Sequence, residues 1–180
     1  MYTPGPAFFQ WPMVSAYTPG VGLVTEAVVP SAPASVMPES ANRAIYHPIV
    51  IVTTYVARRV WWVNGESATG GATIEVGIYR DAGGAPGVKV ISGSAVQSSA
   101  TTVQFVNVTD TALTPDRYWL AIMASSGTDT TLFRSASSII VDAAMRYQQD
   151  SANPLPGTAT PVESTANGIY LFGFATTASP

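Results

Sequence analysis

The sequence predicts an all-β protein, a two-sheet antiparallel β-sandwich with jelly-roll or Ig-like wiring and an extended Pro-rich N-terminal arm. Short apolar stretches recur at regular spacing after residue 43, separated by turns of Gly, Pro, Asn and Asp. No stretch has a convincing helical period. The 180 residues suffice for one core. We therefore expect one β-sandwich domain over residues 42–180, preceded by an arm over residues 1–41.

The arm is expected because residues 1–41 differ in composition from the rest. They contain half of the chain's 14 prolines and only two charged residues, Glu26 and Glu39. Proline at this density prevents both a helix and a central strand. The segment is nevertheless too apolar for a solvated linker. It is expected to lie against a surface, either that of its own domain or that of a neighbouring subunit. Its large apolar residues are Phe8, Phe9, Trp11, Met13, Tyr17, Leu23 and Val24.

The first two strands of the domain are expected at Ile45–Val52 and Tyr55–Val63. Pro48 interrupts the first, which predicts an edge position or the start of a strand, because proline cannot donate a ladder hydrogen bond. Alternation in the second predicts which side chains face inward. The inward residues are expected to be Val56, Val60 and Trp62, and the outward residues Arg59 and Trp61.

The third strand, Ala72–Tyr79, alternates without interruption. Its apolar face would carry Ile74, Val76 and Ile78, and its opposite face Thr73, Glu75, Gly77 and Tyr79. A loop rich in Gly and Pro follows at Arg80–Gly87, and further strands are expected at Val88–Ile91 and Thr101–Val108.

The next strand begins at Tyr118, after a turn at Pro115 and Asp116. Alternate residues are apolar on both of its faces as far as Ala124. A strand of this kind is covered on both sides, so we expect it at the centre of a sheet.

The C-terminal third predicts three shorter strands. The first is Thr131–Arg134 and the second is Ala144–Gln148, although a helical face would also suit the residues around Ala144. Asn153–Gly157 is expected to be an extended loop. The last strand is Ile169–Ala175, with its aromatic residues on one face; these are Tyr170, Phe172 and Phe174.

The charge content is unusual for a soluble domain. Charged residues are 11% of the chain, against about 25% in an ordinary domain, and Lys89 is the only lysine. Interface cores are depleted of charge, so this composition favours a subunit covered by neighbours. The alternative is a β domain coated with Ser, Thr and Gly. The absence of a basic run argues against direct binding to nucleic acid, and no apolar run is long enough for a membrane span or forms a secretory signal.

Reactive groups are few. His47 is the only histidine, no Gly-x-Ser-x-Gly motif occurs and the chain has no cysteine. A triad or a zinc site would need more partners than these, so His47 is expected to be structural. Glycoside hydrolysis needs two facing carboxyls, but Glu75 alone is centred in a predicted strand, and it faces outward. Loop carboxylates are expected to be solvated rather than to bind Ca²⁺; they are Asp81, Asp110 and Asp129. We expect no catalytic residue, metal or cofactor.

Two tryptophans are candidates for a binding surface. Trp61 precedes Trp62 and Trp119 follows Tyr118, so one member of each pair must face away from the other. An exposed ring could anchor a protein interface or stack on a sugar; alternatively, both faces are covered within the domain. Together with the arm, they complete the set of candidate subunit-contact residues: Phe8, Phe9, Trp11, Met13, Tyr17, Leu23, Trp61 and Trp119.

Three motifs resemble a module of tailed-bacteriophage virion proteins. Ile74–Gly84 (IEVGIYRDAGG) resembles its "V-G-I-Y-D-x-x-G" strand and turn, Leu113–Ile122 (LTPDRYWLAI) its "L-x-P-G-x-Y-Y-L-A" strand, and Pro154–Pro161 (PLPGTATP) its "L-P-x-T-x-T" loop. The likeness covers about residues 44–175. The chain departs from it by carrying Asp116 where Gly is usual, and Arg80 before the Asp of the turn.

The resemblance implies a virion structural protein without catalytic residues: a head-decoration or cement protein, a head fibre or a tail component. Its partners would be the major capsid protein or other virion subunits, and it would be a homo-oligomer, with a trimer favoured. It would be made in the host cytoplasm and reside in the virion. The alternative is a receptor- or carbohydrate-binding β-sandwich at a tail or fibre tip.

Overall fold

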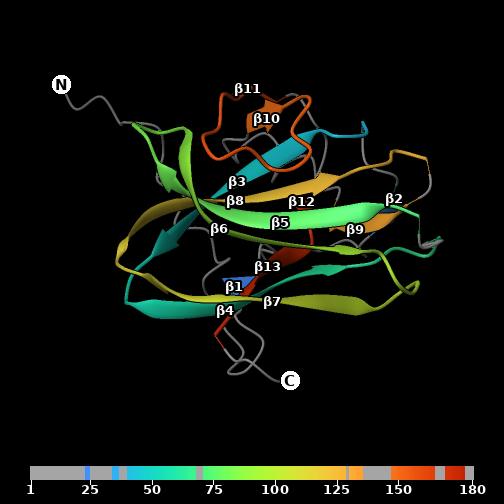
Figure 1. Cartoon of the computed structure of the whole chain (residues 1–180), viewed down its shortest axis with the longest axis horizontal. Coiled ribbons are helices and arrows are strands. Elements are labelled where there is room, and N and C mark those ends of the chain that lie inside the picture. Colours follow the sequence, from blue (N-terminus) through green and yellow to red (C-terminus); the bar gives the residue numbers. More distant parts are fainter. Residues whose placement is uncertain are drawn as a thin grey trace.

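The structure, a computed structural model, describes residues 23–24, 34–36, 40–67, 71–128, 130–135, 147–164 and 169–176. These residues form 13 β-strands, and none of them is helical. Two antiparallel sheets pack against each other, and a smaller third sheet lies beside them (Figure 1). The prediction of an all-β, two-sheet antiparallel architecture is therefore confirmed.

The larger sheet has six strands. β8 (Asp116–Ala124) pairs along its length with β3 (Ala44–Ile51) on one side and with β5 (Thr73–Asp81) on the other. The strand predicted to be central is therefore an interior strand. The order across the sheet is β11 (Val162–Glu163), β10 (Tyr147–Gln149), β3, β8, β5 and β6 (Pro86–Val96).

Pro48 lies in a half of β3 that has one strand neighbour among the described residues. Ala44–Tyr46 pair with both β10 and β8, whereas His47–Ile51 pair with β8 alone. A proline that donates no hydrogen bond is tolerated in such a place. β3 as a whole is therefore not the expected edge strand, because β10 and β8 flank its first half; within the described part of the chain, only its second half has the character of an edge.

The smaller sheets use both ends of the chain. The four-stranded sheet has the order β1 (Leu23–Val24), β13 (Phe172–Ala175), β4 (Tyr55–Val63) and β7 (Val103–Leu113). The three-stranded sheet has the order β12 (Ile169–Tyr170), β9 (Leu132–Ser135) and β2 (Ala34–Val36). Two short pieces of the expected arm, β1 and β2, therefore pair with strands of the same chain.

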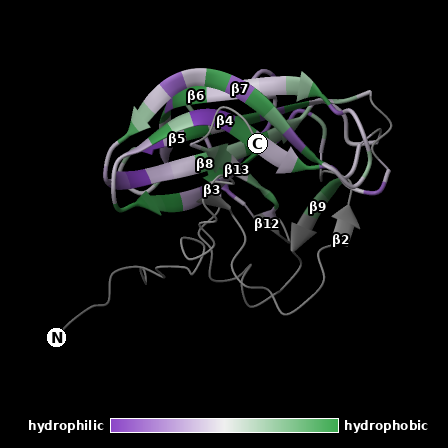
Figure 2. Ribbon diagram, turned by 90° about the horizontal axis from the view of Figure 1, so that it is seen from below, coloured by the Kyte–Doolittle hydropathy of each residue, from purple (hydrophilic) through white to green (hydrophobic). Residues whose placement is uncertain are grey.

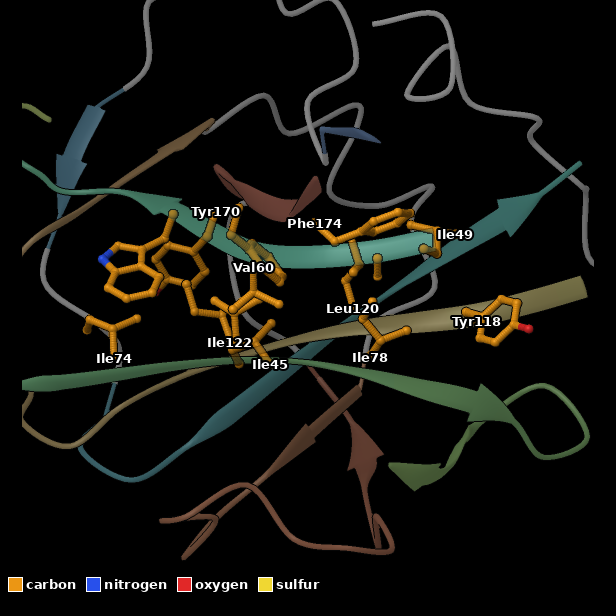
Figure 3. Packing of buried hydrophobic residues seen from close by; sticks show 14 of the residues in the cluster. Ile45, Ile49, Val60, Ile74, Ile78, Tyr118, Leu120, Ile122, Tyr170 and Phe174 are labelled. Carbon is orange, nitrogen blue, oxygen red and sulfur yellow. The ribbon is translucent and has the colours of Figure 1, made fainter. Parts of the chain in front are cut away.

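The main core lies between the two large sheets. Alternate residues of β3, β5 and β8 point toward β4 and β13, and apolar side chains from both sheets meet there (Figure 3). Burying them drives the packing of one sheet on the other. The buried residues of this core are Ile45, Ile49, Ile51, Ala57, Val60, Trp62, Ile74, Val76, Ile78, Leu113, Tyr118, Leu120, Ile122, Ala124, Leu132, Tyr170, Phe172 and Phe174.

One inward residue was predicted wrongly. Ala57, not Val56, belongs to the core. The register between β4 and β7 shifts between Ala57 and Arg59, and a bulge of this kind changes which side chains face inward. Arg59 faces the other side of the sheet, with its guanidinium 5.4 Å from the centre of the Phe105 ring.

Several strand boundaries also differ from the prediction. β6 is longer than expected, because Ser92, Gly93 and Ser94 interrupt the apolar pattern of a strand that continues to Val96. β7 begins at Val103 and continues beyond the predicted end, to Leu113. The last predicted strand divides into β12 and β13 at Leu171. The backbone of Leu171 bonds to Phe133 on one side and to Val63 on the other. β10 begins at Tyr147, and the earlier part of its predicted range lies outside the described residues.

The strands that end the two large sheets are short on one side of the sandwich and long on the other. On one side the last strands, β11 and β1, have 2 residues each. On the other side the last strands, β6 and β7, have 11 residues each. We call these two strands and their connecting loop, residues 97–102, the β6–β7 side (Figure 2).

Candidate interaction surface

The outer face of the six-stranded sheet is covered by the chain itself. The segment Asp150–Pro161, which we call the strap, connects β10 to β11 and lies across this face. The loop predicted at Asn153–Gly157 is confirmed, but bends at residues 153, 154 and 157 show that it is not extended, and the strap also forms part of a second core. The buried residues of this core are Ala44, Tyr46, Tyr79, Trp119, Ala121, Met123, Ala152, Leu155 and Ala159.

Leu155 anchors the strap. A β-carbon added at Gly77 would lie only 3.0 Å from Leu155 Cδ1, so the glycine leaves the space that this side chain fills. The Leu155 N–H donates to a carboxylate oxygen of Glu75 at 2.8 Å, and its carbonyl accepts from Lys89 Nζ at 2.6 Å. Lys89 Nζ also lies 3.6 Å from Glu75. One residue of the strap is thereby held by its side chain and by both of its backbone groups.

Glu75 is on the outer face, as its alternation predicts, but the strap buries it. A carboxylate in such a place must be paired or hydrogen-bonded, and Lys89 and the Leu155 N–H meet this need. Its role in the described structure is to hold the strap.

Tyr79 also holds the strap, and Tyr46 lies beside it. The Tyr79 hydroxyl donates to the Pro156 carbonyl at 2.7 Å, and the two tyrosine rings meet edge to face at 5.3 Å. Burial raises the pKa of Tyr46 to about 12 and raises that of Tyr79 as well, with the nearby Tyr46 hydroxyl adding to the shift. Both hydroxyls are therefore neutral at physiological pH.

Trp119 lies next to Tyr79 on this face, as its register partner in the neighbouring strand. It is fully buried, its indole N–H donates to Asp81 at 2.8 Å, and its ring meets that of Tyr147 at 5.2 Å. Asp81 also accepts from the Gly84 N–H and lies 4.0 Å from Arg117. The expectation of a solvated loop carboxylate is thus wrong for Asp81, which closes a turn and holds a tryptophan.

The other two loop carboxylates lie elsewhere. Asp110 is exposed and pairs with Arg58 at 3.1 Å. Asp129 is outside the described residues. Within the residues that the structure describes, no three His, Asp or Glu side chains are grouped as a metal site would require.

His47 points into the main core rather than to the surface. It is buried, and its ring lies 5.8 Å from that of Phe172. This position agrees with the structural role expected for it.

The candidate contact residues are not gathered at one place. Trp61 is 4% exposed, on the outer face of the four-stranded sheet, and donates its indole N–H to the Phe174 carbonyl. Trp119 faces away from Tyr118 as predicted, but under the strap. Both indole rings are therefore covered within the domain, which was the alternative to an exposed binding ring. Leu23 lies in β1, and five candidates are outside the described residues: Phe8, Phe9, Trp11, Met13 and Tyr17.

The β6–β7 side is the surface that the sequence analysis missed. No charged residue occurs from Val90 to Thr109, a run that includes most of both strands and the loop between them. Three valines are well exposed on this side: Val88, Val96 and Val103. The charge-free run was visible in the sequence, but its position along one side of the sandwich depends on sheet order.

The outer edges of the two strands differ. The strap closes the start of the β6 edge, where the Lys89 N–H donates to the Gly157 carbonyl and the Ala159 N–H to the Gly87 carbonyl, both at 2.8 Å. Among the described residues, β7 has a strand neighbour only on its β4 side. Within the described part of the chain, β7 is therefore a long sheet edge whose outward backbone groups have no strand partner.

No protein-family model matches the chain, and no curated protein matches it significantly. Among the described residues, no helix of membrane-spanning length and hydropathy is found.

Proposed function

We propose that this chain is a non-enzymatic structural subunit of a tailed-bacteriophage virion, which binds neighbouring subunits by burying surface. It is a head-decoration or cement protein, a head fibre or a tail component. Its partners are the major capsid protein or other virion subunits and further copies of itself, with a trimer as the expected oligomer. The β-sandwich has jelly-roll or Ig-like wiring, and the Pro-rich arm adds contacts.

The observation that carries the proposal is the charge-free run Val90–Thr109 on the β6–β7 side. The whole chain has few charged residues, and here two long strands contain none over the run Val90–Thr109. Isolated domains commonly protect such edges with charges, prolines or short strands. Protein interfaces, in contrast, are depleted of charge at their centre. A surface of this kind is suited to a neighbouring subunit.

The sequence resemblance supports the virion setting. Its three motifs are far apart in the chain, but they meet in the fold: the first lies in β5, the second in β8, which pairs with β5, and the third in the strap that covers both. They form one packed unit, whose residues are held by Glu75, Tyr79 and Lys89. A shared packing unit of this kind is what a structural module would preserve.

Glycan or receptor binding is not favoured by any observation on the described residues. The aromatic rings that would provide a stacking platform, Trp61 and Trp119, are both buried.

Quantitative mass spectrometry of purified virus particles whose genome encodes this chain tests the proposal. The chain is expected among the particle proteins, with many copies in a shell role and few in a tail role. Absence from the particles would overturn the virion assignment.

A truncated chain tests the arm. The deletion should end at residue 22, because Leu23–Val24 form β1 and pair with β13. We expect the deletion of residues 1–22 to lower incorporation into particles while leaving thermal unfolding of the domain unchanged. Undiminished incorporation would contradict the role of the arm.

A further inference from the structure

We infer that the β7 edge is a self-association site, where β7 pairs antiparallel with β7 of a second copy about a two-fold axis at Phe105. The inference rests on the proposed function, since it names the partner of the β6–β7 side, and at this side it joins two copies rather than the three of the expected trimer. It joins two four-stranded sheets into one continuous sheet.

The backbone of β7 determines which groups are available. Asn64 N–H donates to the Thr102 carbonyl at 2.8 Å, which makes this a hydrogen-bonded pair. The register then continues through Trp62 with Gln104 and Val60 with Val106. In an antiparallel ladder, hydrogen-bonded pairs alternate with pairs whose backbone groups point away. The outward groups therefore belong to the odd-numbered residues Val103, Phe105 and Asn107.

These three residues determine the register of the pairing. An axis at Phe105 places Phe105 opposite its own copy and Val103 opposite Asn107 of the second copy. All three outward positions then form hydrogen-bonded pairs, about six hydrogen bonds in total. A two-fold axis at Gln104 or Val106 would place only two of the three outward residues in hydrogen-bonded pairs. The edge is most fully satisfied by the Phe105 axis.

The regular part of the edge has a definite end. The register with β4 shifts beyond Asn107, where β7 carries extra residues before Thr111. A bulge interrupts the row of outward backbone groups. The self-pairing segment is therefore Val103–Asn107, which is symmetric about Phe105.

Charge favours a second copy as the occupant. The chain carries a net charge of −3, so two copies repel each other at most surfaces. The segment Val103–Asn107 has no charge, and the nearest carboxylate on β7, Asp110, would face Ala100 of the second copy and is already paired with Arg58. Like charges are not brought opposite each other. On the opposite side of the sandwich, the described strands that end the two sheets have 2 residues each.

Disulfide trapping tests the register, because the chain has no cysteine of its own. In the proposed pairing the two Phe105 α-carbons are about 5.5 Å apart, which a disulfide can bridge. Two Val103 residues would be offset by roughly 13 Å along the strands. We expect the Phe105→Cys chain to form a disulfide-linked dimer at least tenfold faster than the Val103→Cys chain, although Val103 is well exposed. Equal rates or the reverse order would overturn the inference.

Sedimentation equilibrium of the unaltered chain and of Val103→Pro provides a second test. The Val103 N–H points away from β4, so proline there blocks the second copy while leaving the β4 pairing in place. We expect at least tenfold weaker dimerisation, with thermal unfolding measured to confirm the fold. Val52→Pro changes an equally exposed valine outside the strands, and it should dimerise as the unaltered chain does.

The measured masses separate this inference from the proposed function. Dimers that Val103→Pro dissociates support the inference. Trimers that persist in Val103→Pro overturn it, but they support association of the subunit with itself through another surface. A chain that is present in particles and monomeric when purified also overturns the inference, while the proposed virion role stands.

Discussion

At Gly93, β6 passes close to side chains of the opposite sheet. A β-carbon added there would lie 2.9 Å from a methyl group of Val106, 2.9 Å from one of Val108 and 3.0 Å from one of Val60. Real β-carbons do not approach other carbons this closely, and all three methyl groups belong to stiff, β-branched side chains. Gly93→Ala must therefore push the sheets apart or force these valines into unfavourable rotamers.

The cost follows from overpacking. Adding a methyl group to a filled core destabilises a protein by about 1–3 kcal/mol. With three contacts to relieve at once, we expect Gly93→Ala to lower the free energy of unfolding by about 2–3 kcal/mol. For a chain of this length, that corresponds to a fall in Tm of roughly 5–10 °C.

The assay is urea and thermal unfolding beside a matched glycine. Gly157→Ala adds the same methyl group where no atom lies within 4 Å and the φ angle is not positive. We expect that variant to be neutral or slightly stabilising, because alanine reduces the entropy of the unfolded chain. If Gly93→Ala unfolds at the same temperature as Gly157→Ala, the close approach of β6 to Val106 and Val108 is wrong.

Three further predictions concern the face beneath the strap. Leu155→Ala should lower the free energy of unfolding by about 2–4 kcal/mol, because it leaves a cavity over Gly77; urea unfolding measures this, and a loss below that of an exposed Val162→Ala control would contradict the anchor role. Trp119→Phe should cost about 1–2 kcal/mol through the lost hydrogen bond to Asp81, and Asp81→Asn should reduce the difference between Trp and Phe in a double-mutant cycle. Stability should fall as the pH rises from about 10 to 12, because the unfolded state releases the Tyr46 proton near pH 10 whereas the folded state holds it up to a pKa of about 12. Urea unfolding across this range would show the fall, it should be smaller in Tyr46→Phe, and an equal fall in that variant would exclude Tyr46 as its source.

The strands could be predicted from the sequence where alternation was uninterrupted. β5 was recognised because Ile74, Val76 and Ile78 alternate with polar or small residues, and β8 because both of its faces are apolar. In these strands the side-chain period alone determines which residues share a face. The prediction failed for Val56, because a bulge depends on the partner strand and leaves no mark in the sequence of β4.

What covers a face could not be predicted in the same way. The alternation of side chains along β8 and β5 places Trp119 and Glu75 on the outer face of their sheet. It contains no information about the strap that covers them, because the strap lies far away in the chain. The strap itself has no period, and its only signals are the Pro-Leu-Pro-Gly turn residues. The candidate surface likewise needed the sheet order, which places the two strands of the charge-free run Val90–Thr109 on one side.

The single lysine has a chemical consequence. Lys89 is the only lysine in the sequence, and its ammonium is held between Glu75 and the Leu155 carbonyl. Because these contacts and the strap limit the access of a reagent to the amine, Lys89 should be acylated slowly in the folded protein and quickly once urea releases the strap. The acylation rate of this one residue would thus report opening of the outer face, without any introduced probe.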